Sequence, residues 1–80
     1  MYVVYVLKSL KRKYFYVGMT NNIERRLKQH ETGQSISTKL FRPLVLVLKE
    51  KYDSRQEARS REKYLKSGVG REYLKRTLEQ

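Results

Sequence analysis

The stretch YFYVGMTNNIERRLKQHE, residues 14–31, joins a strand pattern directly to a helix pattern. Tyr14–Met19 is rich in aromatic and β-branched residues, which favour extended structure in a half-buried sheet. Thr20-Asn21-Asn22 then supplies side chains that cap a helix N-terminus, and Gly33 is the kind of residue at which helices end. The stretch therefore predicts a strand over Tyr14–Met19 and a helix over Ile23–Glu31.

Two further apolar runs, Tyr2–Leu7 (YVVYVL) and Leu44–Lys49 (LVLVLK), predict additional strands. The short, mainly polar connection Lys8–Lys13 indicates that the first two strands form an antiparallel hairpin. Leu44–Lys49 is apolar without alternation, which is typical of a strand covered on both faces, so helices are expected on both sides of the sheet. Ser35–Arg42 is compatible with either a turn or a short helix.

A second helix is predicted over Arg55–Lys66. Ser54 is a favourable N-cap, Glu57 completes a capping box, and Gly68 is expected to close the helix. A shorter third helix is expected over about Gly70–Leu78. The order β-β-α-β-α-α describes one α/β domain over residues 1–80, with a small, three-stranded, mostly antiparallel sheet flanked by helices.

The composition points to a polyanionic partner. The 80 residues include 19 Lys and Arg against 8 Asp and Glu, a net charge of +11, with enough hydrophobic residues (39%) to form a core. A compact, strongly basic domain most often binds nucleic acid, and an anionic membrane surface is the second choice. The absence of Cys excludes disulfides, thiolate metal sites and a cysteine nucleophile.

Localisation is predicted from what the sequence lacks. The apolar runs are far shorter than the roughly 20 residues that span a bilayer, and the N-terminus has no secretory signal pattern. A chain without Cys suits a reducing compartment. We therefore expect a soluble cytoplasmic protein with no membrane partner.

Polar residues occupy positions on the predicted helices that should face inward. At 100° per residue, Arg26 and His30 fall on the apolar stripe of Ile23 and Leu27. Glu62 falls on the inner face of the second predicted helix by the same geometry. An inward carboxylate is costly unless it is paired, protonated or bound to a metal ion.

Each of these residues also has a structural explanation. Arg26 and Glu62 are equally compatible with an ion pair that ties two helices together, and His30 taken alone fits a hydrogen-bonded packing residue. The remaining cations of the second helix are interpreted as solvated charges that face phosphates; they are Arg59, Lys63 and Lys66.

The predicted strands add phenolic groups. Alternation places Tyr16 and Gly18 on one face of their strand, and Tyr5 on one face of the first strand. Phenols serve as packing groups, nucleic-acid contacts or acid–base groups. Gly18 inside a strand suggests a bulge or a close backbone approach to a ligand.

Taken in order, Val3-Val4-Tyr5, Tyr16-Val17-Gly18, the R-L-x-x-H pattern of Arg26–His30, and Glu62 resemble the GIY-YIG nuclease superfamily. The chain is most similar to small, single-domain bacterial members that resemble the nuclease domain of the bacterial repair excinuclease. The resemblance covers roughly residues 2–66. It departs from the family pattern in the first motif, where Val3-Val4 replaces Gly-Ile.

The resemblance implies a metal-dependent phosphodiester hydrolase. It implies that Tyr16, assisted by Tyr5, is the general base and that Arg26 clamps the scissile phosphate. His30 would orient or protonate a nearby group, and Glu62 would hold a single Mg²⁺ or Mn²⁺ ion. Nucleic-acid contacts are expected from Gly18, Arg59, Lys63 and Lys66.

The expected function is hydrolysis of DNA by an endonuclease of this superfamily. Branched or damaged DNA and a role in DNA repair are expected, with a protein partner or homodimerisation contributing specificity. The main alternative is a nucleic-acid-binding module that keeps the fold without cleaving. A basic scaffold that contacts only proteins is a third possibility.

Overall fold

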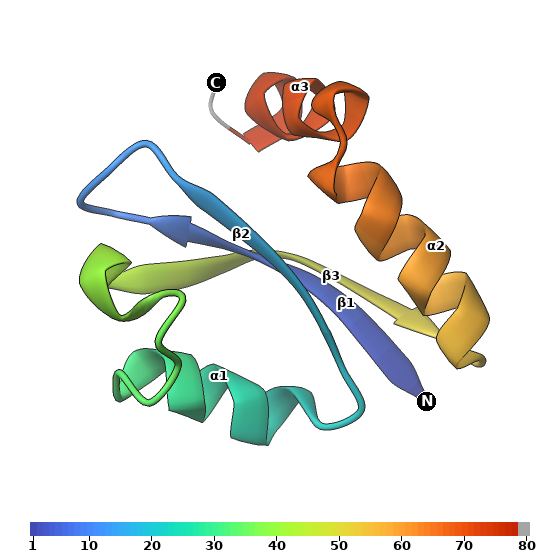
Figure 1. The fold of residues 1–80 in the computed structure, drawn as a ribbon, viewed down its shortest axis with the longest axis horizontal. Coiled ribbons are helices and arrows are strands. Elements are labelled where there is room, and N and C mark those ends of the chain that lie inside the picture. Colours follow the sequence, from blue (N-terminus) through green and yellow to red (C-terminus); the bar gives the residue numbers. More distant parts are fainter. Residues whose placement is uncertain (79–80) are drawn as a thin grey trace.

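The computed structural model describes residues 1–78 and has a three-stranded antiparallel sheet in the order β2-β1-β3 (Figure 1). This confirms the predicted fold class and element order. The elements are β1 (Tyr2–Ser9), β2 (Phe15–Thr20), α1 (Ile23–Glu31), a short 3-10 helix (Lys39–Phe41), β3 (Leu44–Tyr52), α2 (Arg55–Lys66) and α3 (Gly68–Leu78).

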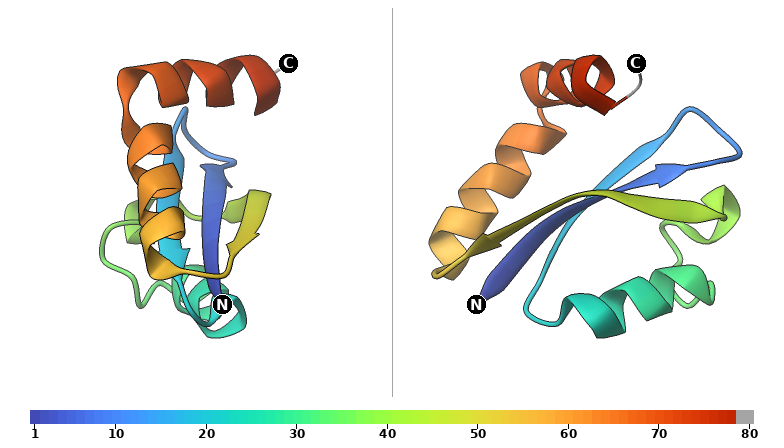
Figure 2. Two further views of the ribbon diagram at one scale, coloured as in Figure 1. Left: turned by 90° about the vertical axis from the view of Figure 1, so that its right-hand side faces the viewer. Right: turned by 180° about the vertical axis from the view of Figure 1, so that it is seen from behind.

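The middle strand β1 divides the interior into two apolar clusters. On one face, Val4 and Val6 pack with Val17 and with residues of α2 and α3, among them Leu65 and Leu74. On the other face, Val3, Tyr5 and Leu7 pack with residues of α1. Helices therefore cover both faces of the sheet, as predicted, with α1 on one side and α2 and α3 on the other (Figures 1 and 2). Full burial of one leucine contributes about 1.5–3 kcal/mol.

The strand that is covered on both faces is β1, not β3. The sequence analysis predicted this position for Leu44–Lys49, but β3 lies at an edge of the sheet. Val45 and Leu46 keep 37% and 40% of their surface exposed. An uninterrupted apolar run does not distinguish a central strand from an edge strand, because both β1 and β3 have one.

The boundaries of α1 agree with the capping residues. The Asn22 side chain accepts a hydrogen bond from the backbone N–H of Arg25, at 3.1 Å. After the helix ends at Glu31, Gly33 adopts a φ of +82°, the left-handed conformation that glycine accepts without a steric penalty. The predicted helix over Ile23–Glu31 is confirmed.

The N-terminus of α2 also agrees with its cap, because the Ser54 hydroxyl accepts a hydrogen bond from the Glu57 N–H. Its C-terminus differs from the prediction. Gly68 does not close α2 but begins α3, which therefore starts earlier than the expected Gly70. Ser67, in an extended conformation, separates the two helices, and its hydroxyl donates to the Tyr64 carbonyl.

The segment between α1 and β3, left open by the sequence, contains the 3-10 helix. Its Phe41 stacks on Tyr14, with ring centroids 3.8 Å apart, and so attaches the segment to the β1–β2 hairpin. No helix within residues 1–78 is long and apolar enough to cross a membrane.

Candidate active site

Four of the predicted site residues lie together between the sheet and α1. The Tyr5 hydroxyl is 2.9 Å from Nε2 of His30. The Tyr16 ring lies 4.9 Å from the His30 ring and 6.2 Å from the Tyr5 ring, measured between centroids. Arg26 precedes His30 by about one turn of α1 and interacts with both hydroxyls. These four residues, Tyr5, Tyr16, Arg26 and His30, are called the phenol cluster below.

Gly18 makes room for the phenol cluster. It pairs with Tyr5 across the β1–β2 ladder. A Cβ atom at Gly18 would lie 2.5 Å from Cζ of Tyr5 and 2.9 Å from Cε1 of Tyr16. The predicted bulge at Gly18 is wrong, because β1 and β2 pair regularly there; the irregularity lies between Val6 and Leu7, on the β3 side. The close approach is made by the protein's own tyrosine.

His30 is neutral and held at both ring nitrogens. It is 1% exposed, and while Nε2 meets Tyr5, Nδ1 lies 2.6 Å from the Thr38 hydroxyl. Burial, with a smaller effect from the Arg26 cation, lowers the pKa of His30 to about 4. One ring nitrogen of the neutral imidazole donates and the other accepts. His30 therefore orients Tyr5 and does not present a cation to a substrate.

Tyr5 keeps its proton at neutral pH. Its side chain is fully buried, and burial, followed by the neighbouring Tyr16, raises the pKa of Tyr5 to about 12. A buried phenol with this pKa is a poor base, which argues against the assisting role expected for Tyr5. Tyr16 is only half-buried and is the more accessible phenol of the cluster.

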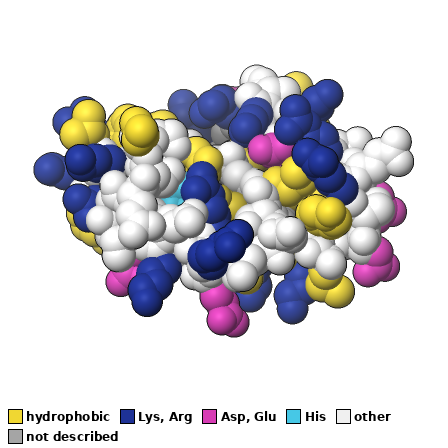
Figure 3. Space-filling view, turned by 60° about the horizontal axis from the view of Figure 1, so that its bottom comes forward, with side chains coloured by type: hydrophobic (Ala, Val, Ile, Leu, Met, Phe, Trp, Pro, Cys, Tyr) yellow, Lys and Arg dark blue, Asp and Glu magenta, His cyan; other side chains and the backbone are white. Residues whose placement is uncertain are grey.

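Arg26 supplies the positive charge of the cluster. Its guanidinium donates to Oε1 of Gln29 at 2.8 Å and is half-buried. Burial works against the charged form, but the interactions with the Tyr16 and Tyr5 hydroxyls outweigh it and raise the pKa of Arg26. The cation is thus held beside the accessible Tyr16, where it can attract an anionic oxygen. Figure 3 shows the histidine lying low on this face, with Lys and Arg side chains beside it.

Glu62 is buried as predicted, but its partners are not on α1. Its two oxygens lie 3.5 Å from Nη1 of Arg59 and 3.1 Å from Nζ of Lys66, both also on α2. The alternative of an Arg26–Glu62 ion pair is wrong: among residues 1–78 no such pair forms. The physical reason is that α1 and α2 pack on opposite faces of the sheet.

The surroundings of Glu62 fit a hydrated hard cation better than a caged one. The described part of the chain has no group of three acidic, His or Cys side chains able to hold a metal ion. Mg²⁺ keeps most of its water and needs only one or two carboxylates. Glu62 offers one carboxylate, and its present partners Arg59 and Lys66 are more than half exposed, so water can replace their contacts.

The cations predicted to contact nucleic acid lie on α2 around Glu62. Arg59 and Lys63 line a hollow of about 500 Å³ with Arg55. Lys66 and Arg59 are engaged with Glu62, whereas Lys63 is exposed and has no hydrogen bond or ion pair within residues 1–78. The structure therefore gathers these three residues on one helix, on the other side of the sheet from the phenol cluster.

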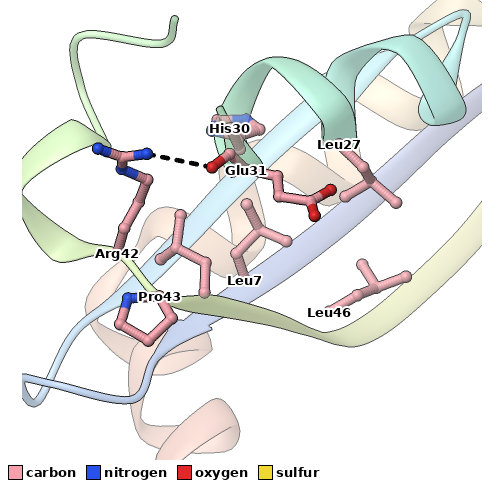
Figure 4. Close-up of a pocket in the computed structure, with 8 residues that line it drawn as sticks. Leu7, Leu27, His30, Glu31, Arg42, Pro43 and Leu46 are labelled. Atoms are coloured by element: carbon pink, nitrogen blue, oxygen red, sulfur yellow. Dashed lines mark hydrogen bonds between the residues drawn. The ribbon is translucent and has the colours of Figure 1, made fainter. Parts of the chain in front are cut away.

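A hollow of about 540 Å³ lies behind His30, at the end of α1 (Figure 4). Its walls are mainly apolar, with Leu7, Leu27 and Leu46 facing into it, and Arg42 at the rim donates to the Glu31 carbonyl. Such a lining does not suit a phosphodiester. We therefore assign the approach of an anionic substrate to the half-buried Tyr16 and Arg26 instead.

Sequence analysis missed two residues of the site. Thr38, which is fully buried, holds Nδ1 of His30, and Gln29 holds Arg26. Gln29 lies within the predicted helix, three residues after Arg26, so that spacing could have revealed it. Thr38 lies in a segment whose sequence shows neither periodicity nor a motif.

Comparison with known proteins agrees with this site. The model of the GIY-YIG catalytic domain family matches residues 1–75. The UPF0213 protein CPE1444 of Clostridium perfringens is 42% identical over 64 residues, which are 79% of this chain and 68% of the relative. The UPF0213 protein SH2523 of Staphylococcus haemolyticus is 38% identical over 73 residues, 90% of this chain and 88% of the relative. These names state no activity, and no solved structure matches the chain.

Proposed function

This chain belongs to the GIY-YIG family of nucleases, and on that premise we propose that it is a metal-dependent endonuclease that hydrolyses DNA phosphodiester bonds. The observation that carries the proposal is the position of Arg26 beside Tyr16, both half-buried, over a layer of Tyr5 and His30 that is fixed by hydrogen bonds. A rigid support under two accessible groups is what a catalytic constellation requires.

The proposed roles follow from exposure and charge. Tyr16, as the phenolate, would accept at its Oη the proton of the attacking water. Arg26 would bind the phosphoryl oxygens and stabilise their developing negative charge. Tyr5 and His30 do not touch substrate in this proposal, because both are buried; they position Tyr16 and Arg26.

Glu62 would hold the divalent cation, Mg²⁺ or Mn²⁺, together with water molecules. The chemistry that such an ion supplies is stabilisation of negative charge on the leaving oxygen. Lys63, Lys66 and Arg59 would bind the DNA backbone near the ion. Branched or damaged DNA as substrate, and a protein partner or second copy that adds specificity, belong to the same proposal.

A nucleic-acid-binding module without cleavage is the second candidate. One observation favours it: both oxygens of Glu62 are occupied by Arg59 and Lys66, as in an ordinary structural ion pair. The net charge of +11 supports DNA binding in both cases.

A nicking assay with purified protein separates the two candidates. Supercoiled plasmid and branched oligonucleotide duplexes are incubated with Mg²⁺, with Mn²⁺ and with a chelator. The nuclease is expected to cut only in the presence of a divalent ion. Binding without cutting under every condition would leave the binding module as the function.

A further inference from the structure

A third hollow, of about 380 Å³, lies between the β1–β2 hairpin and α3. In all views of Figures 1 and 2, α3 lies over the tip of this hairpin. The hollow thus joins two segments that are far apart in the sequence. Its lining comes from Lys13, Tyr14 and Phe15 of the hairpin and from Arg71, Glu72 and Lys75 of α3.

The charges around this hollow are unbalanced. Three of its residues are cations, Lys13, Arg71 and Lys75, and only Glu72 is acidic. All three cations are exposed, and none has an ion pair within residues 1–78. Because like charges repel, gathering them from two elements is unfavourable unless an anion lies between them.

The hollow is continuous with both halves of the candidate active site. Nε of Arg71 donates to the backbone carbonyl of Lys66, whose ammonium contacts Glu62. On the hairpin side, Tyr14 forms part of the wall. Burial and the nearby Tyr16 raise the pKa of Tyr14, while Arg71 opposes them, so Tyr14 interacts with both neighbours.

We propose that the hollow between the hairpin and α3 is a second phosphate-binding site, which holds the nucleic-acid backbone at a distance from the position of cleavage. This inference rests on the proposed function. Lys13 from one wall and Arg71 and Lys75 from the other offer donors to the non-bridging oxygens of a phosphodiester, as charge-assisted hydrogen bonds require. A backbone held there extends past Tyr16, so the site also sets the direction in which DNA crosses the protein.

The test compares two double variants that remove the same charge. Lys13→Gln/Lys75→Gln changes the hollow, and both side chains lack hydrogen bonds and ion pairs within residues 1–78. Lys49→Gln/Lys51→Gln removes two exposed lysines from β3, an edge strand on the far side of β1 from β2. Fluorescence anisotropy then follows binding of a labelled short duplex over a series of salt concentrations, and thermal unfolding checks that each variant is folded.

The hollow variant is expected to lower the slope of log affinity against log salt by about 2, since each lost phosphate contact removes about one released counterion. At about 0.1 M salt, its affinity should fall on the order of tenfold to a hundredfold. The β3 variant should change both quantities much less. If Lys13→Gln/Lys75→Gln does not fold, the two single variants, one from each wall, replace it, each with an expected slope change of about 1.

Equal losses in the two double variants would mean that only net charge matters and would overturn the inference, while metal-dependent nicking by the wild type would leave the proposed function intact. Failure of the wild-type protein to bind DNA at low salt would overturn both. Thermal unfolding with inorganic phosphate separates the source of the anion. Stabilisation by phosphate that the hollow variant loses, with unchanged DNA affinity, would identify a site for free phosphate and overturn the backbone assignment.

Discussion

Nδ1 of His30 lies 2.6 Å from the Thr38 hydroxyl, and this contact holds the imidazole whose opposite nitrogen meets Tyr5. The three side chains come from α1, from the loop before the 3-10 helix and from β1, and all three are buried. The site is therefore supported by a hydrogen-bonded chain that ends beneath Tyr16. Thr38 is the member of this chain that is easiest to test, because valine has nearly its shape.

Thr38→Val should lower the free energy of unfolding by about 1–3 kcal/mol, because Nδ1 of His30 is left buried without a partner. Urea or thermal denaturation measures the loss. Thr32→Val is the control: Thr32 is exposed and bonds only to carbonyls of its own helix, so its loss should stay within about 0.5 kcal/mol. Thr38→Ser, which keeps the hydroxyl, should restore nicking that Thr38→Val weakens. Equal stability of Thr38→Val and Thr32→Val would contradict the supporting role of the Thr38 hydroxyl.

The pKa of His30 predicts a loss of stability in mild acid. In the folded protein it is lowered from 6.5 to about 4. Between these values the unfolded chain binds a proton that the folded protein does not, so the free energy of unfolding falls as pH falls. The stabilisation is complete above about pH 6.5, and about 2 kcal/mol should be lost by pH 5, before most carboxylates titrate.

Denaturation at several pH values, together with an NMR titration of the imidazole, checks this prediction. The control is His30→Gln, which should lose the pH dependence between about 6.5 and 5. An imidazole that titrates near 6.5 in the folded protein would show that His30 is neither desolvated nor held by Tyr5 and Thr38.

The sequence was informative where a local signal coincided with the structure. The caps Asn22 and Ser54 defined two helix starts, and helical periodicity placed His30 and Glu62 in the interior. Arg26, on the same stripe, is half-buried beside Tyr16 and Tyr5. These predictions needed only residues within a few positions of each other.

The sequence was uninformative where the result depends on which surfaces meet. Periodicity indicates that Arg26 and Glu62 face inward but not that they face opposite sides of one sheet. Thr38 is defined only by the distant residue that it contacts. The exposure of Val45 follows from the strand order, which the apolar runs of β1 and β3 do not determine.

Tyr16→Phe tests the proposed base. The change removes one half-buried hydroxyl, so the fold should persist, while DNA cleavage should fall on the order of 10²–10⁴-fold. Tyr2→Phe is a matched control, because Tyr2 is also half-buried but packs on the opposite face of the sheet. Nicking rates of both variants with Mg²⁺ or Mn²⁺ are compared with the wild type. Wild-type cleavage by Tyr16→Phe would remove Tyr16 from the mechanism.

Glu62→Gln tests the metal ligand and separates catalysis from binding. The partners of Glu62, Arg59 and Lys66, are more than half exposed and stay solvated when the carboxylate is removed. The loss of stability should therefore be at most about 1 kcal/mol. Metal-dependent cleavage should disappear, whereas DNA affinity should stay equal or rise, since one negative charge near the backbone is gone. Glu57→Gln, an exposed change of the same charge on α2, should keep cleavage.

Three measurements on Glu62→Gln give three different answers. Binding of Mn²⁺, followed by electron paramagnetic resonance, should be lost in Glu62→Gln and kept in Glu57→Gln, and this readout does not depend on activity. A variant that unfolds, with a loss of roughly 3–5 kcal/mol, would instead identify Glu62 as a structural charge, because that is the cost of breaking a buried ion pair. A folded variant that still cuts DNA would refute the assignment of Glu62 to the site. A folded protein that binds DNA, no longer binds Mn²⁺ and no longer cuts is the outcome that the nuclease proposal requires.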